Sequence, residues 1–237
     1  MRCNGLPATL GILSNMKLSS IIAARHRIYP SQDLLFTVDS SINYQTFIYL
    51  NTNLNYSGVI DWGDGSSNTV LSGTGNTQAA HNFSTVNTFQ VKVSGTQVPS
   101  FKILSSTQYN VVSVENLGNI GLQDTSTMFK GSVNLTSANL GDYITSIGDE
   151  IFKDCTSLTS VTIGVNTTSI GNHPFNGCTA LATVNCSTNK SVIDSSTDIF
   201  LNTASPLTIN VPIGTSGWSA GTGLSIGGNT NVTVNLI

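Results

Sequence analysis

The sequence predicts a mainly β protein with two domains and a short N-terminal helical arm. Charged residues make up only 9% of the 237-residue chain, and the abundant Ser, Thr, Asn and Gly residues favour short strands and turns over helices. Short alternating apolar runs occupy the first half, and a 23-residue repeat occupies the second half. No apolar run is long enough to cross a bilayer, so no membrane insertion is expected.

An arm of residues 1–32 precedes the first expected strand. The arm carries a formal charge of +4, whereas the rest of the chain carries −7. Residues 14–27 read as a short helix that needs a partner, because an isolated helix of this length is marginal in water. The side chains expected to dock combine an apolar stripe with basic residues: Lys17, Leu18, Ile21, Ile22, Arg25 and Arg27. We expect the arm to dock on an acidic protein surface or nucleic acid, and an ordinary amphipathic helix is the alternative.

Six short β-type runs are expected between residues 33 and 97, with polar or glycine turns between them. The runs are 34–38, 46–50, 58–62, 68–72, 79–83 and 88–93. In the last run, the apolar residues Phe89 and Val91 flank the polar Gln90, as in a strand with one buried face. Short strands at this spacing indicate a β-sandwich.

The stretch VIDWGDGSS at residues 59–67 is interpreted as a structural turn. Its glycines supply backbone conformations that other residues resist, and Asp64 can accept hydrogen bonds from the turn's N–H groups. The residues expected to build the turn and to pack on it are Trp62, Gly63, Asp64, Gly65 and His81. Asp61 and Asp64 are alternatively an acid/base pair or cation ligands, although the EF-hand pattern is absent.

These residues resemble the polycystic-kidney-disease (PKD) domain family. The Trp-Gly-Asp-Gly run, the later His81-x-Phe83 and the alternating strand at 88–93 follow the order of that family. The resemblance implies an immunoglobulin-like β-sandwich over residues 33–97. One departure is the turn at residues 85–87, where the family usually has a glycine.

The second half of the chain repeats with a period of 23 residues. Phe129, Phe152 and Phe175 recur at this spacing, and the unit reads roughly I-G-x-x-x-F-x-x-C-x-x-L-x-x-V-x-I. With weaker copies at 111–118 and 199–212, about five turns are expected, more than the three that a stable solenoid needs. Residues 232–236 are expected to add a closing strand.

The repeat resembles the BspA-type leucine-rich repeat family, which occurs in surface, secreted and phage proteins. The resemblance rests on the Phe-x-x-Cys-x-x-Leu frames at 152–158 and 175–181, and on the Val-Pro and Trp within 211–218. It implies a solenoid with a terminal cap over residues 98–237. Each turn is expected to contribute one short strand, stacked in parallel on the next at about 4.8 Å.

The middle residue of each repeat strand is expected to point outward, between two inward apolar residues. These middle residues are Asn139, Thr162, Asn185 and Asn210. They would form an uncharged polar row on the exposed face. This row is either a binding surface for a glycan or protein, or merely a solvated face.

No catalytic residue, metal site or cofactor is expected. Residues 217–221 match G-x-S-x-G, yet no helical pattern follows Ser219, as a nucleophile elbow would require. The histidines are dispersed and do not have zinc-site spacing. Cys155 and Cys178 occupy the same phase of the repeat, which favours free thiols in the core, and a disulfide between them is the alternative.

The predicted function is structural and adhesive, without catalysis. The first hypothesis is a virion protein (a capsid decoration or cement protein, a head fibre or a tail-associated protein) in many copies or as a homo-oligomer, consistent with a first segment that lacks a secretory signal pattern. Its partners would be capsid or tail proteins through the arm, and a host surface glycan or protein. The alternative is a bacterial cell-surface adhesin or a glycan/protein-binding module. A glycan hydrolase would rest on Asp61 and Asp64 alone.

Overall fold

Strands account for almost all the regular structure in this computed structural model. The structure describes residues 32–42, 45–50, 54–103, 110–196 and 198–237. The predicted helix at 14–27 and the docking residues of the arm lie outside these ranges, and Gln32 is the one residue of the arm that the structure describes. A four-residue helix, α2 (Lys190–Ile193), is the exception to the β structure in the described part. The mainly β fold class is therefore confirmed.

Seven strands build the N-terminal part of the described chain. They are β1 (Leu34–Asp39), β2 (Gln45–Leu50), β3 (Asn55–Asp61), β4 (Thr69–Thr74), β5 (Thr77–Asn82), β6 (Thr88–Gln97) and β7 (Lys102–Ile103). Strands β4, β3, β6 and β1 are neighbours in one antiparallel sheet, and β5, β2 and β7 form a second sheet. Strand β7 follows residue 97, the predicted end of the first domain, and pairs with β2.

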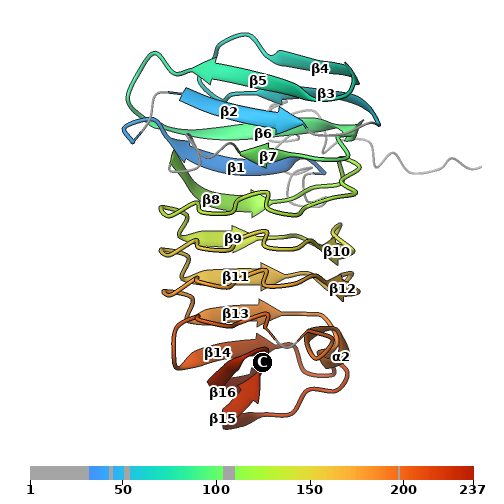
Figure 1. The fold of residues 1–237 in the computed structure, drawn as a ribbon, viewed down its shortest axis with the longest axis vertical. Helices are drawn as coiled ribbons and strands as arrows, with labels where there is room; N and C mark the ends of the chain where they lie inside the picture. The colour runs from blue at the N-terminus through green and yellow to red at the C-terminus, as the bar shows by residue number, and fades with distance from the viewer. Residues whose placement is uncertain (1–31, 43–44, 51–53, 104–109, 197) are drawn as a thin grey trace, which may run out of the picture. The chain divides into compact units, whose positions relative to one another are not determined.

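The buried faces of these two sheets pack on each other. Alternation places Leu34, Phe36 and Val38 of β1 inside, each 0% exposed. The ring of Phe36 meets that of Phe101, close to β7, edge-on with centroids 5.9 Å apart. Phe83 stacks on Phe89 of β6 at 4.7 Å. Aromatic contacts therefore join the two layers, which appear one in front of the other in Figure 1.

The C-terminal part is a β-solenoid built around six parallel strands. These are β8 (Val111–Asn116), β9 (Ser137–Asn139), β11 (Ser160–Ile163), β13 (Thr183–Cys186), β14 (Leu207–Val211) and β16 (Asn229–Leu236). Each pairs in parallel with the next, so five turns separate the first strand from the last (Figure 1). The predicted number of turns and the closing strand are thus confirmed.

Three further strands and one junction complete the sheets. Strands β10 (Ser146–Ile147) and β12 (Ser169–Ile170) pair in parallel on a second side of the turns. Strand β15 (Gly221–Ile226) pairs antiparallel with β16 at the end of the solenoid. Strand β8 pairs antiparallel with β1, so one eleven-stranded sheet runs through both parts of the chain.

A column of phenylalanine rings fills the solenoid. Phe129, Phe152, Phe175 and Phe200 are each 0% exposed. Successive rings stack with centroids 5.5, 5.8 and 5.8 Å apart and interplanar angles of at most 14°. The 23-residue spacing seen in the sequence therefore corresponds to one turn, and the predicted shared interior is confirmed.

Candidate functional site

The exposed side of the parallel strands is the candidate functional surface, here named the strand face. In β11 and β13 the burial alternates, so that Val161 and Ile163 point inward and Ser160 and Thr162 point outward. Because the parallel pairing is in register, outward residues of the same repeat position lie next to each other on neighbouring strands. Two rows of outward residues result, one of Asn and Thr and one of Ser and Thr.

The first row contains the four predicted residues and extends to Asn235. Nδ2 of Asn185 donates to Oγ1 of Thr162 (3.5 Å), and Nδ2 of Asn210 donates to Oδ1 of Asn185 (3.1 Å). Asn235 continues the series to Asn210 (3.2 Å), whereas Oδ1 of Asn139 accepts a backbone N–H two residues further on (3.0 Å). These amides therefore bond mainly to one another, and each amide retains a second N–H for a partner.

The second row lies two residues before the first and was not predicted. Its members are Ser113, Ser137, Ser160, Thr183, Thr208 and Thr233, all half-buried and in register. Apart from Ser113, their hydroxyls form no hydrogen bond within the described part of the chain. A hydroxyl both donates and accepts, so this row offers an array of available hydrogen-bonding groups. The signal was present in the sequence, because alternation points residue i−2 to the same face as residue i.

Glu115 is the acidic residue at the β8 end of the strand face. Its Oε1 accepts hydrogen bonds from the hydroxyls of Thr37 (2.6 Å) and Ser113 (2.5 Å). Beyond it, the two rows contain Ser, Thr and Asn without charge. Such a surface suits a neutral hydrogen-bonding partner better than an ion or a nucleic acid, whose binding relies on basic side chains.

The WGDG turn packs into the core of the N-terminal part. The indole of Trp62 is 1% exposed, donates its N–H to Thr69 Oγ1 (2.9 Å) and stacks on the His81 ring at 4.9 Å. Gly63 has a φ of +80°, and a Cβ there would collide with the carbonyl oxygen of Gln90. These contacts hold Trp62, Gly63 and His81 at this corner, whereas Gly65 has a φ of +80° and a Cβ there would meet no neighbour.

The Asp64 carboxylate is the most perturbed group of the turn. Oδ2 lies 2.7 Å from Nε2 of His81, and Oδ1 accepts the backbone N–H of Ser66 (3.0 Å). Burial alone would raise the pKa, but the hydrogen bonds from Ser66 and His81 and the His81 charge lower it to about 2. A carboxylate held ionised in this way is a poor proton donor or acceptor at neutral pH.

Asp61 contacts different partners from those of Asp64. Its Oδ1 accepts the Gly63 N–H (3.0 Å), and its Oδ2 lies 3.7 Å from the Lys92 ammonium. The two aspartates thus bond to different partners. Across the described residues, no group of three or more His, Cys, Asp or Glu side chains could hold a metal ion.

The G-x-S-x-G match at 217–221 lacks the geometry of a nucleophile elbow. Ser219 is exposed in a loop, and strand β15 follows it, where the elbow needs a helix. The preceding Trp218 is buried and donates its indole N–H to the carbonyl oxygen of Thr188 (3.0 Å). This loop therefore closes the end of the solenoid.

The cysteines of the repeats are buried, free thiols. The Cys155 thiol donates to the Phe129 carbonyl oxygen (3.1 Å), and the Cys178 thiol donates to that of Phe152 (3.0 Å). Burial raises the pKa of Cys178 to about 12 and that of Cys186 to about 11. The structure thus has the predicted free thiols, and they are in their unreactive form at neutral pH. Among the described residues, no helix has the length and hydropathy needed to cross a membrane.

Comparison with known proteins identifies the repeats. Residues 101–218 match the family model of the BspA type Leucine rich repeat region in six copies. The repeat resemblance is therefore confirmed for this part of the chain, whereas the PKD-like resemblance of residues 33–97 stays a prediction. No curated protein and no solved structure matches the chain.

Proposed function

We propose that this protein is a non-enzymatic binding and display protein that presents the strand face of its solenoid to a partner. The match to BspA-type repeats supports a surface or binding module. The observation that carries the proposal is the Ser/Thr row, whose hydroxyls from Ser137 to Thr233 have no hydrogen-bond partner within the described chain. Evenly spaced polar groups on neighbouring strands suit an extended neutral partner, such as a glycan or the polar surface of a protein.

The rigidity of the face supports a binding role. The backbone strands are held on both sides by the parallel ladder, and the neighbouring Asn185, Asn210 and Asn235 side chains are fixed by their mutual hydrogen bonds. A surface that is ordered before binding loses less conformational entropy when a partner docks. Solenoids commonly bind along such extended surfaces.

A charge placed in the middle of the face tests this proposal. Thr183→Lys adds a flexible cation to the Ser/Thr row, and we expect it to reduce binding to host cells at least about tenfold by obstructing the central strands. Thr179→Lys is the matched control, because Thr179 is an exposed residue in the loop before the same strand. Equal binding by both variants and the unmodified protein would show that the strand face is not the binding surface.

We further propose that the protein is a structural component of a virion, as a capsid decoration, a head fibre or a tail-associated protein. The charge asymmetry supports this, because a +4 arm of residues 1–32, joined to a remainder of charge −7, suits docking on an acidic capsid or tail protein. The solenoid would then project its strand face toward a host surface glycan or protein, in many copies per particle. Virions would carry the chain at a fixed ratio to their coat protein.

The alternative is a cell-surface adhesin or glycan/protein-binding module, which would use the same face. The two proposals differ in location: an adhesin is found in the cell-envelope fraction and binds as an isolated chain. A chain found only with purified virions supports the first proposal, and a chain found only with the envelope supports the second.

A further inference from the structure

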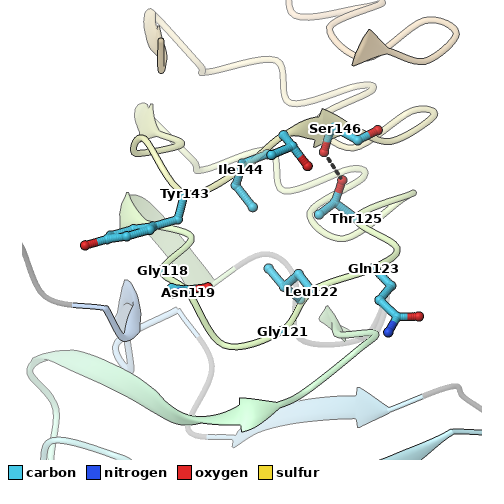
Figure 2. Close-up of a pocket in the computed structure, with 10 residues that line it drawn as sticks. Gly118, Asn119, Gly121, Leu122, Gln123, Thr125, Tyr143, Ile144 and Ser146 are labelled. Atoms are coloured by element: carbon cyan, nitrogen blue, oxygen red, sulfur yellow. Dashed lines mark hydrogen bonds between the residues drawn. The ribbon is translucent and has the colours of Figure 1, made fainter. Parts of the chain in front are cut away.

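A second polar site lies away from the strand face, between the first two turns of the solenoid. A pocket of about 180 Å³ is formed by the segment 118–125 on one side and by 143–146 on the other. In Figure 2, Tyr143 and Asn119 lie at one end of the pocket, Gln123 lies near the other, and Leu122 and Ile144 lie between them. The pocket thus combines an aromatic ring, two amides and an apolar centre.

The polar groups around this pocket are available to a ligand. The amides of Asn119 and Gln123 are exposed, and the Tyr143 side chain is half-buried. None of these three side chains forms a hydrogen bond within the described part of the chain. The backbones of Asn119 and Gln123 are held in place, since the Asn119 N–H donates to the Gln32 carbonyl oxygen (2.6 Å) and the Gln123 N–H donates to that of Pro99 (2.9 Å).

The lining residues limit the chemistry of the ligand. No Asp, Glu, Lys, Arg or His is among the ten residues that line the pocket, so it offers nothing to balance the charge of a phosphate, carboxylate or amine. Amide groups both donate and accept hydrogen bonds, and an aromatic ring offers an apolar face. A neutral sugar matches this set, because its hydroxyls also donate and accept and its C–H groups form an apolar face. The volume is below the roughly 300–1,000 Å³ typical of drug-sized ligands, so one sugar unit suits it.

A neighbouring hollow extends the site. A pocket of about 380 Å³ shares Gly121 and Gln123 with the first, and its other lining residues are uncharged as well. Gly121 has a φ of +82°, and a Cβ there would collide with the carbonyl oxygen of Thr96, so the loop passes close to the end of β6. Gln123 therefore lies where the next sugar unit of a bound oligosaccharide would pass.

We propose that this pocket binds one unit of a neutral oligosaccharide, with Tyr143 as the stacking platform and Asn119 as a hydrogen-bonding group, while Gln123 bonds to the next unit. The site is distinct from the strand face, and it adds a sugar site to the binding function proposed above. The first hollow would hold one sugar unit, and the second would hold its neighbour in the chain.

The test uses the full chain and a defined panel of oligosaccharides. An array of neutral hexose and N-acetylhexosamine oligomers is compared with sialylated, sulfated and uronic-acid oligomers, and calorimetry measures Kd for the strongest binder. We expect binding to neutral oligomers. Tyr143→Ala should weaken it about tenfold, and Asn119→Ala and Gln123→Ala about three- to tenfold each. Tyr143→Phe, which keeps the ring, should have a smaller effect.

Controls separate this site from folding and from the strand face. Tyr49→Ala changes a half-buried tyrosine on β2, outside the pocket, and should leave Kd unchanged. Circular dichroism checks folding, and if Tyr143→Ala does not fold, the exposed Asn119 and Gln123 variants carry the test. Three results would overturn the proposal: no binding to neutral oligomers, stronger binding to acidic ones, or a Kd that the pocket variants leave unchanged. Loss of binding only in Thr183→Lys would refute the pocket while supporting the strand face.

Discussion

The replacement Phe152→Ala tests how much the aromatic column stabilises the solenoid. Phe152 is 0% exposed, and its ring stacks between Phe129 at 5.5 Å and Phe175 at 5.8 Å. Truncating a buried Phe to Ala typically costs about 3–5 kcal/mol, and stacked pairs add about 0.5–1.5 kcal/mol beyond area burial. Because Phe152 loses two stacked partners, we expect the free energy of unfolding to fall by about 4–5 kcal/mol. This is a large part of the roughly 5–15 kcal/mol of a typical domain.

Urea unfolding followed by far-UV circular dichroism measures this loss as a lower transition midpoint. Val165→Ala is the control, since Val165 is 58% exposed and its truncation should change the free energy by no more than about 0.5 kcal/mol. If folded Phe152→Ala lost less than about 2 kcal/mol, its ring would not fill the interior of the turns, and the stacked solenoid would be wrong.

Three further predictions concern charge, thiols and the Asn row. The pKa of Asp64 is about 2 in the folded protein and 3.8 in the unfolded chain, so the stabilisation by its carboxylate is complete above pH 3.8 and is lost as pH falls through 2. Asp64→Asn should therefore lower the free energy of unfolding by roughly 1–2 kcal/mol at pH 7. Thermal unfolding should show the stability difference between the two proteins shrinking from pH 5 to pH 2, and a constant difference would contradict the prediction. The Cys178 thiol should resist alkylation at pH 8 until denaturant is added, as counted by mass spectrometry, and rapid native labelling would contradict its burial. Asn210→Ala removes the bonds to Asn185 and Asn235, so urea unfolding should show a loss of about 1–2 kcal/mol, and an unchanged midpoint would show that the row adds no stability.

The solenoid could be predicted from the sequence because residues one repeat apart in the sequence become neighbours in space. Val161 and Val184 are 23 residues apart in the chain and directly opposite each other on β11 and β13. The same relation stacks the Phe residues of successive turns in one column and the Leu residues in another, so the recurring apolar residues form the core. The closing strand β16 was predictable for the same reason, since its Val232 and Val234 alternate inward.

Other features depend on contacts that leave little trace in the sequence. Strand β7 has only two residues, so it has no alternation from which a strand could be predicted. The sugar pocket joins Asn119 and Gln123 to Tyr143, residues outside the recurring apolar positions, and only the stacking of turns brings them together. The Ser/Thr row could also be predicted from the sequence, because the residue two positions before the outward residue of each strand points to the same face.

The most direct test of the proposal that residues 1–32 dock this protein on a virion is native mass spectrometry of the assembly that contains this chain, beside a version without residues 1–32. The account predicts a fixed number of copies bound to capsid or tail proteins for the complete chain, and a free chain after the deletion. A complete chain that occurs only as a free monomer, or a shortened chain that keeps the same partners and copy number, would contradict it.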